Sequence, residues 1–281
     1  LLSVSAWTQT ADVNKGCSPL TVNFTAPVGS TSWYWDFKDG GSSNIQNPSN
    51  IFTSPGTYLV EFHNTPNGPV VGSVQVVVWP KPDVVIAATP ETGCVPLTVQ
   101  FQDNSTLQGD IQIINRSWVF GDGGSAGNFI NPSHLYNTAG NFAVSLELTT
   151  NYPSCNITAL FADKVKTAAK PTATFTTTPN PAQACTPPLI VAITNNSTGL
   201  APLSYNWNFG NGNTSTVAGP PAQNYTQTGV FPIKLKVTNI LGCVDSSTVN
   251  VRIGAPKADF YAADTTPCLN KLVSFINTSD P

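Results

Sequence analysis

An internal repeat constrains the fold of this chain more than any other feature of its sequence. Three times, a tryptophan and a phenylalanine two positions apart lead into a glycine-containing turn, in residues 35–40, 118–123 and 207–212. Each of these segments is followed by an alternating run of apolar and polar residues that opens on a glycine. Self-similarity of this kind indicates several copies of one small structural unit along the chain.

A cysteine opens each copy, and we refer to these residues as the leading cysteines. They are Cys17, Cys94, Cys185 and Cys268. Their spacing suits one small β-sandwich per copy. We therefore expect copy one in residues 1–80, copy two in residues 81–168 and copy three in residues 169–254, with residues 255–281 as the start of a truncated copy four.

Strand signals dominate every copy. Phe142, Val144 and Leu146 alternate with other residues, which is the two-residue period of a half-buried β-strand. Asp-Gly, Asn-Gly and Asn-Pro dipeptides separate such runs, and these pairs favour turns. No long segment carries the apolar spacing of a helix. The pattern predicts an all-β fold of tandem sandwiches joined end to end.

Composition argues against several functions. Charged residues make up only 10% of the chain and the net charge is −3, without the basic cluster that nucleic-acid binding needs. No apolar run is long enough for membrane insertion of this segment. The two histidines, His63 and His134, are not part of any recognisable catalytic, metal-binding or phosphate-binding motif. We therefore expect no enzyme activity, no metal and no cofactor.

Six aromatic residues are predicted to form the cores. The two members of each pair project from one strand face, because they are two positions apart. They are Trp35, Phe37, Trp118, Phe120, Trp207 and Phe209. An exposed tryptophan at this place would instead offer a stacking platform for a sugar. Recurrence of the pair at the start of every turn favours the buried interpretation.

The turns that follow these pairs admit two interpretations. Asp36, Asp39, Asp110 and Asp122 offer carboxylate oxygens of the kind that Ca²⁺ binds. Copy three has Asn208 and Asn211 where copy one has Asp36 and Asp39, so the negative charge is dispensable within this chain. A tight turn with a side-chain hydrogen bond accounts for Asp or Asn before glycine, and we prefer this interpretation.

Two further cysteines suggest disulfides. Cys155 and Cys243 follow the last alternating strand of copies two and three, at similar distances from Cys94 and Cys185. This spacing predicts one bridge within each copy, Cys94–Cys155 and Cys185–Cys243. Such bridges would place the protein outside the cytoplasm.

The remaining leading cysteines have no partner in this scheme. Copy one lacks a second cysteine near Gly68, so Cys17 is predicted to be a buried, unpaired thiol. The partner of Cys268 is expected past the end of the sequence. At the junctions, Pro80 and Pro171 predict short, extended linkers, and Trp79 is expected to pack between the first two copies.

The motifs of copy two carry a family resemblance. Residues 118–123 (Trp-Val-Phe-Gly-Asp-Gly), 131–136 (Asn-Pro-Ser-His-Leu-Tyr) and 140–146 together resemble the PKD (polycystic kidney disease) domain. Copy one departs from the pattern at Lys38 and copy three at Asn211. The resemblance implies seven-stranded, immunoglobulin-like sandwiches. With the Cys-x-Pro-Leu-x-Val element, it extends to PKD arrays in giant secreted proteins of Bacteroidota.

This resemblance implies a non-catalytic extracellular array. It would act as an extended stalk or spacer of a large bacterial cell-surface adhesin or filament on the outer surface, of the gliding-motility kind and exported by type IX secretion. Its partners would be the neighbouring domains of the same chain, with a surface polysaccharide or protein ligand bound by regions outside this window. Two alternatives remain: an accessory binding module of a secreted polysaccharide- or protein-degrading enzyme, and self-assembly through a strand edge at residues 74–79.

Overall fold

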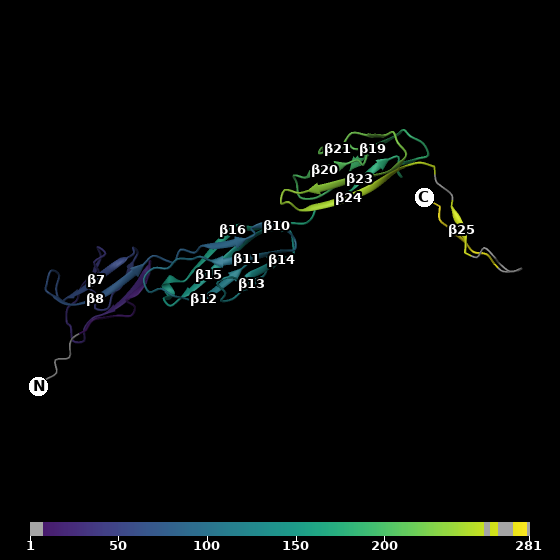
Figure 1. Ribbon diagram of the computed structural model, residues 1–281. Helices are drawn as coiled ribbons and strands as arrows, with labels where there is room; N and C mark the ends of the chain where they lie inside the picture. Colours follow the sequence, from purple (N-terminus) through teal and green to yellow (C-terminus); the bar gives the residue numbers. More distant parts are fainter. Residues whose placement is uncertain (1–7, 256–258, 264–271, 280–281) are drawn as a thin grey trace. The chain divides into compact units, whose positions relative to one another are not determined.

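The computed structural model describes residues 8–255, 259–263 and 272–279 (Figure 1). Within these residues it consists of β-strands, connecting loops and one short 3-10 helix, η1 (Pro153–Cys155). The all-β class predicted from the alternation is confirmed. The chain divides into two compact units. The first holds copies one and two apart from residues 92–97, 137–140 and 167–168, which cluster with copy three in the second.

Copy one is a sandwich of a five-stranded and a three-stranded sheet. The larger sheet, in the order β2-β8-β7-β4-β5, contains β2 (Lys15–Cys17), β4 (Tyr34–Asp36), β5 (Ser42–Ser43), β7 (Gly56–His63) and β8 (Val70–Trp79). The smaller sheet, in the order β1-β3-β6, contains β1 (Thr10–Ala11), β3 (Leu20–Thr25) and β6 (Ser49–Phe52).

Copy two repeats this order. Its larger sheet, β10-β16-β15-β12-β13, contains β10 (Thr92–Cys94), β12 (Ile113–Val119), β13 (Ser125–Ala126), β15 (Gly140–Thr150) and β16 (Ile157–Ala168). Its smaller sheet, β14-β11-β9, contains β9 (Ile86–Thr89), β11 (Leu97–Asp103) and β14 (Ser133–Tyr136).

Copy three repeats it again. Its larger sheet, β18-β24-β23-β20-β21, contains β18 (Gln183–Ala184), β20 (Ser204–Asn208), β21 (Thr214–Ser215), β23 (Gly229–Thr238) and β24 (Val244–Ile253). Its smaller sheet, β17-β19-β22, contains β17 (Phe175–Thr178), β19 (Leu189–Asn195) and β22 (Gln223–Tyr225). Beyond it, β25 (Phe260–Ala262) and β26 (Phe275–Asn277) pair antiparallel.

The first strand of each sandwich is split between the two sheets. In copy one, β1 pairs antiparallel with β3, whereas β2 runs parallel to the last strand, β8. In copy three, β17 pairs antiparallel with β19 and β18 runs parallel to β24. Because of this split, each copy has eight hydrogen-bonded strands where the family resemblance implies seven. The split also brings the leading cysteine beside the end of the last strand.

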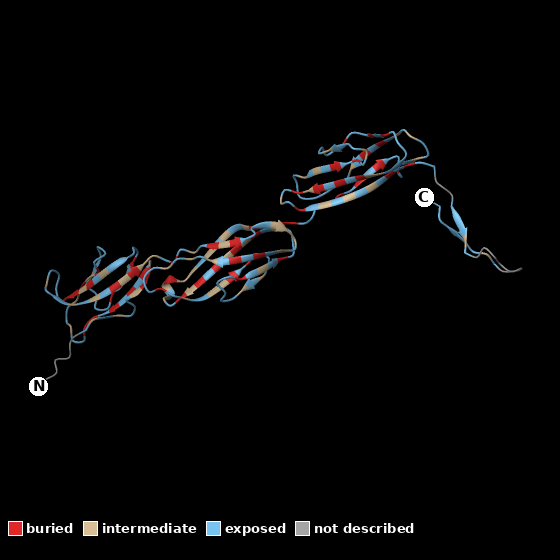
Figure 2. Cartoon of the chain, in the orientation of Figure 1, coloured by how far each residue is buried: buried red, intermediate tan, exposed pale blue. Residues whose placement is uncertain are grey.

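Alternation builds the core between the sheets. In β3, Leu20, Val22 and Phe24 are buried while the residues between them are exposed. Figure 2 shows the same stripes of buried and exposed residues along the long strands of each sandwich. β-branched and aromatic side chains suit such half-buried strands. Copies one and three each enclose an apolar core, and the inward side chains of copy two, such as Phe101 and Leu146, are buried as well.

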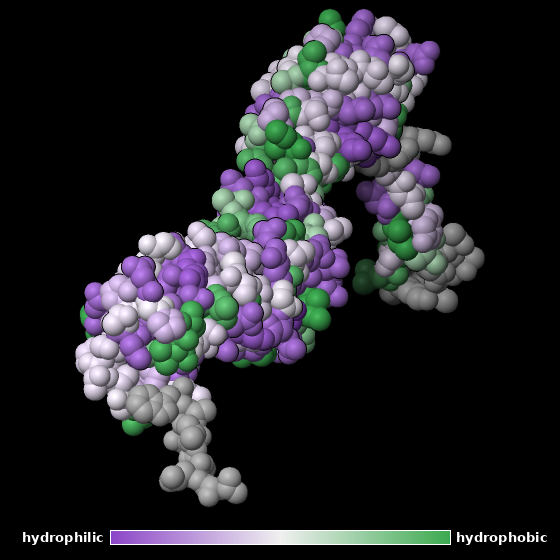
Figure 3. All heavy atoms as spheres, turned by 90° about the vertical axis from the view of Figure 1, so that its left-hand side faces the viewer, coloured by the Kyte–Doolittle hydropathy of each residue, from purple (hydrophilic) through white to green (hydrophobic). Residues whose placement is uncertain are grey.

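The outer surface is mixed. On the face drawn in Figure 3, hydrophobic residues form small separate groups among hydrophilic ones. In the part of the chain that the structure describes, no helix has the length and hydropathy needed to cross a membrane. The same described residues contain no group of three or more His, Cys, Asp or Glu side chains placed to hold a metal ion.

Candidate functional site

The repeated aromatic pairs lie in the cores. Trp35, Trp118 and Trp207 are fully buried, and Phe37, Phe120 and Phe209 are at most 3% exposed. The indole N–H of Trp118 donates to the Phe129 carbonyl at 2.9 Å, and the other two indoles make equivalent bonds in their copies. A buried, hydrogen-bonded indole offers no open face for a sugar. These residues therefore hold the sandwiches together.

The turns after the aromatic pairs are closed by side chains. In each copy, an Asp or Asn side chain accepts a hydrogen bond from the backbone N–H two residues later, at 2.8 Å for Asp39, 2.9 Å for Asp122 and 3.1 Å for Asn211. An amide thus does in copy three what a carboxylate does in copies one and two. This is a turn-forming role, and it needs no bound cation.

A second side chain braces each turn from the neighbouring sheet. His134 Nε2 lies 2.8 Å from Asp122 Oδ2, and Asn50 Nδ2 donates to Asp39 at 2.7 Å. The ring of His134 also stacks on Phe120, with centroids 4.2 Å apart. These contacts give His134 a role in the turn and in packing. Burial raises the pKa of Asp122, but hydrogen bonds from His134 and the turn backbone outweigh it and hold that pKa below its usual value.

The disulfides connect different copies. Cys17 of copy one is bonded to Cys155 of copy two, and Cys94 of copy two is bonded to Cys243 of copy three. Their Cα–Cα separations of 4.9 and 5.5 Å lie in the usual range for disulfides. Cys185 is free and exposed. We refer to Cys155 and Cys243 as the trailing cysteines.

The predicted bridges Cys94–Cys155 and Cys185–Cys243 are therefore wrong, and so is the prediction of an unpaired Cys17. Copy three gives the physical reason. Cys243 directly precedes β24, and Cys185 follows β18, which pairs with the far end of β24. Ten residues of strand at about 3.3 Å each separate the two positions by roughly 30 Å. A disulfide requires Cα atoms within about 7 Å, so it cannot form within one copy.

The parallel pairing of the strand that carries the leading cysteine with the last strand determines where this cysteine lies. It lies at the end of the sandwich from which the chain continues into the next copy. Cys17 is in register with Trp79, the last residue of β8. In copy two, the N–H that follows the leading cysteine, that of Val95, donates to Ala168, the last residue of β16, at 3.0 Å. The trailing cysteines stand in hairpins at the opposite end of their sandwiches. A leading cysteine therefore meets the trailing cysteine of the next copy.

An apolar cluster packs around the first bridge. Cys17, Cys155 and Ile111 are buried together, and Trp79 and Tyr152 pack against them. The rings of Trp79 and Tyr152 lie 5.3 Å apart. The expectation that Trp79 packs between the first two copies is thus confirmed. The cluster shields the bridge from solvent, since both sulfur-bearing residues are 0% exposed.

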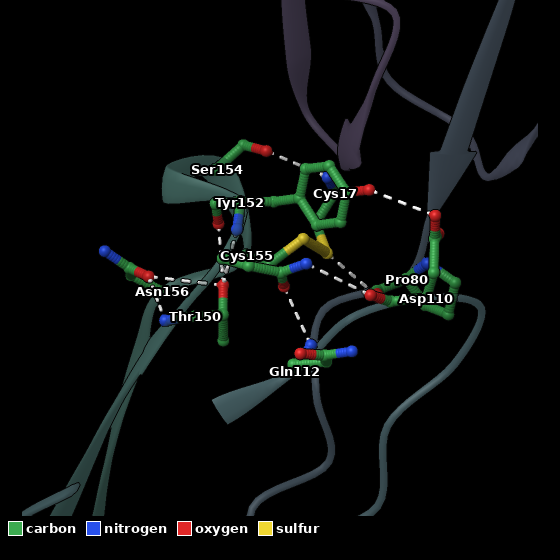
Figure 4. The surroundings of a disulfide bond; sticks show 10 residues. Cys17, Pro80, Asp110, Gln112, Thr150, Tyr152, Ser154, Cys155 and Asn156 are labelled. Carbon is green, nitrogen blue, oxygen red and sulfur yellow. Dashed lines mark hydrogen bonds between the residues drawn. A yellow bond between two sulfur atoms is a disulfide. The ribbon is translucent and has the colours of Figure 1, made fainter. Parts of the chain in front are cut away.

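Polar contacts surround this cluster. Lys15 Nζ of copy one lies 2.6 Å from Asp110 Oδ2 of copy two, and the Tyr152 hydroxyl donates to the same oxygen at 3.1 Å. The hydrogen bond from Lys15 holds the pKa of Asp110 below its usual value. Ser154 Oγ accepts a hydrogen bond from the Cys17 backbone N–H at 2.9 Å (Figure 4). No repeat motif marked these residues, because they touch a different copy.

The second bridge has a less aromatic setting. Cys243 is 1% exposed, and its Sγ lies 3.6 Å from the carbonyl oxygen of Ala168. The buried side chain of Asn239 accepts a hydrogen bond from the Cys243 N–H at 2.9 Å and donates one to Ala169 at 3.1 Å. Asn239 thereby orients the hairpin that carries the trailing cysteine.

Comparison with known families agrees with this architecture. The family model of the PKD domain matches residues 4–76, 79–162 and 168–253. The chain belongs to the PKD domain family. Three successive PKD domains therefore account for most of it, and the bridges connect one PKD domain to the next.

Several solved structures match all or part of this chain. The PKD1 domain of the Vibrio cholerae metalloprotease PrtV is 31% identical, with 31% of this chain and 99% of that chain covered and a TM-score of 0.25. The PKD1 domain of Vibrio anguillarum Epp is 28% identical over 31% and 98% of the two chains, with a TM-score of 0.25. Part of a 1.5-MDa bacterial ice-binding adhesin is 13% identical over 89% and 99%, with a TM-score of 0.38.

Proposed function

We propose that this chain is a non-catalytic, extracellular spacer in a long bacterial surface protein, in which disulfides connect each PKD domain to the next. The observation that carries the proposal is the pairing itself: both bridges join consecutive copies. A bridge within a domain protects the fold of that domain. A bridge between domains instead restrains the junction, which is the property that a spacer needs.

The physical effect of such a bridge is a second connection at the junction. Domains joined by a peptide linker alone normally move relative to one another, since interfaces inside one chain are modest. A covalent bond between Cys17 and Cys155, in addition to the linker after Trp79, leaves the junction few orientations. The packing of Trp79 against Tyr152 limits it further. The two domains can then keep an extended arrangement without a large interface between them.

The disulfides also support the location. Structural disulfides persist in oxidising environments and are rare in the cytoplasm. We place the protein at the outer surface of a bacterium and, on the resemblance to Bacteroidota arrays alone, in an adhesin of the gliding-motility kind that is exported by type IX secretion. Ligand recognition would belong to other parts of that protein.

The two histidines support a non-catalytic role. His63 Nδ1 lies 2.8 Å from the Gly68 carbonyl oxygen and is 8% exposed, and His134 braces the turn at Asp122. Both imidazoles are thus engaged in packing and turn contacts. A general base needs a free path to a substrate proton, which these positions do not offer.

Small-angle scattering tests the spacer proposal. We expect a maximum dimension on the order of 100 Å for the oxidised chain, since three sandwiches of about 30–40 Å would lie in line. Reduction, or the double variant Cys17→Ser/Cys94→Ser, should broaden the distance distribution while the circular dichroism stays that of folded β-sandwiches. A maximum dimension far below 100 Å with both bridges intact would overturn the proposal.

Single-molecule pulling from the two ends gives an independent test. With both bridges intact, the shortest covalent path crosses from Cys17 to Cys155, returns to Cys94 and crosses to Cys243. Less than half of the residues then bear tension, so the oxidised chain should extend to less than half the length of the reduced chain on full unfolding. Equal lengths in both states would contradict the pairing on which the proposal rests.

An accessory module of a degrading enzyme is the alternative outcome. That function would require the array to bind the polymer on which the enzyme acts. A panel of polysaccharides and proteins assayed against the oxidised chain distinguishes the two. Specific binding that is lost on substitution of an exposed residue would favour the accessory module over the spacer.

A further inference from the structure

We propose that Cys185 is the residue to which the PKD domain after copy three is bonded, through the trailing cysteine of that domain. Within the described residues Cys185 is the free cysteine, and it is exposed. A free thiol alone is not a site. Here, however, the same repeat position is occupied by Cys17 and Cys94, and both of these are bonded to the following copy.

Cys185 has the same place in its sandwich as the two bonded leading cysteines. In copy one, Gly16 is in register with Val78, one residue before the Cys17–Trp79 pair. In copy three, Ala184 is in register with Ile253, and the Gly254 N–H donates to the Ala184 carbonyl at 2.9 Å. Cys185 therefore follows β18 beside the end of β24, where the chain leaves copy three.

The next domain begins at the same distance along the chain in all three cases. The first strand of each following copy starts seven residues after the preceding copy's last strand ends, from 79 to 86, from 168 to 175 and from 253 to 260. At the first two junctions this linker length lets a trailing cysteine reach the leading one. The start of β25 at Phe260 repeats the arrangement at the third.

The partner is identified by its position in the repeat. It is the cysteine that stands in copy four where Cys155 and Cys243 stand in copies two and three. Cys268, the leading cysteine of copy four, is excluded because leading cysteines bond forward, to the copy after their own. Cys268 itself lies outside the described residues.

The chemistry is an oxidation with a named acceptor. The two thiols lose two electrons and two protons when the S–S bond forms. A protein disulfide of the thiol-oxidase class receives them by thiol–disulfide exchange and becomes a dithiol. Cys185 is exposed, so such an exchange partner can reach it before the following domain docks.

A lengthened chain built only from residues of this sequence tests the proposal. In it, residues 1–254 are followed directly by a second copy of residues 169–254, so that the new junction reproduces the one after Ala168. We expect a disulfide-linked peptide pair containing Cys185 and Cys243, and one alkylatable thiol, that of the added leading cysteine. In the matched control, the trailing cysteine of the added copy is replaced by serine. There the Cys185–Cys243 pair should be absent and two thiols should react.

Two results would overturn the proposal. One is that Cys185 remains fully alkylatable in the lengthened chain although calorimetry shows the added copy folded. If the added copy does not fold, peptide mapping of the protein as its own cells secrete it decides the matter. We expect Cys185 bonded to a cysteine beyond residue 281. A free Cys185, or one bonded to Cys268 or to another chain, would refute the proposal while leaving the spacer function untouched.

Discussion

Replacement of Trp118 by alanine tests the core assignment most directly. Trp118 is 0% exposed in β12, and its ring packs against those of Phe101 and Phe120, with centroids 5.9 and 6.5 Å away. Truncation of a buried aromatic side chain to alanine costs about 3–5 kcal/mol. The variant also loses the indole hydrogen bond to the Phe129 carbonyl, and such a bond typically contributes about 0.5–1.5 kcal/mol.

This loss is large for a domain of this size. A sandwich of fewer than 100 residues has a free energy of unfolding on the order of 4–13 kcal/mol. Each kcal/mol lost lowers the melting temperature of such a domain by about 4–8 °C. We therefore expect the melting transition of copy two to fall by at least about 12 °C in Trp118→Ala, or copy two to be unfolded at room temperature.

Differential scanning calorimetry makes the measurement, with copies one and three as internal references whose transitions should move far less. Trp118→Phe is the matched variant: it keeps an apolar ring and loses the N–H, so its loss should be clearly smaller. An unchanged melting temperature in Trp118→Ala, together with loss of binding to a sugar, would refute the core assignment and establish a ligand platform.

Five further substitutions in copy two probe its turns and ion pairs. Asp122→Asn should lower the free energy of unfolding of copy two by about 1 kcal/mol at neutral pH. Because the pKa of Asp122 is lowered in the folded state, the stability difference from the parent chain should vanish as the pH falls through that pKa, below about 4. Urea denaturation at a series of pH values measures this difference. Arg116→Gln should lower the free energy of unfolding by about 3 kcal/mol, since the side chain of its partner Asp103 is only 2% exposed. Lys164→Gln should lower it by less than about 1 kcal/mol, since the side chain of its partner Glu91 is 54% exposed. Gly121→Ala should lower the free energy of unfolding by on the order of 3 kcal/mol, since the new Cβ would overlap the backbone of β15. Gly123→Ala should lower it by about 1 kcal/mol, because the new Cβ has open space and only the positive φ at this position is unfavourable for alanine.

The sequence predicts the interior of one sandwich well, for a physical reason. Burial in a strand follows a two-residue period, so the Trp118–Phe120 spacing alone placed both rings on one inward face. Comparison of the copies with one another then gave the information that an alignment of related sequences usually gives. Asn50 and His134 occupy one repeat position, and both were found to brace the turn of their own copy. Local pattern and repeat position were sufficient because these contacts form within one copy.

The disulfides show where this reasoning fails. The spacing from Cys94 to Cys155 measures distance along the chain, whereas a bridge requires proximity in space. The sequence carries no pattern for the parallel pairing of β2 with β8, which brings Cys17 to the far end of its sandwich. The sequence did contain one signal. Pairing within copies left Cys17 without a partner. Pairing between copies gives a partner to every leading cysteine that is followed by a complete copy.

The polarity of the bridges explains how an array of this kind can be extended. Leading and trailing cysteines differ in position, so each bond is a head-to-tail connection, and connections of this type can be repeated from one domain to the next. Copy one has no trailing cysteine near Gly68, so Cys17 begins the series, and the series continues through Cys94. Each added domain brings one cysteine that completes the bond behind it and one that opens the next. Under the pairing proposed for Cys185, its bond would be the next in this series, and duplication of a single domain can lengthen the spacer without new chemistry.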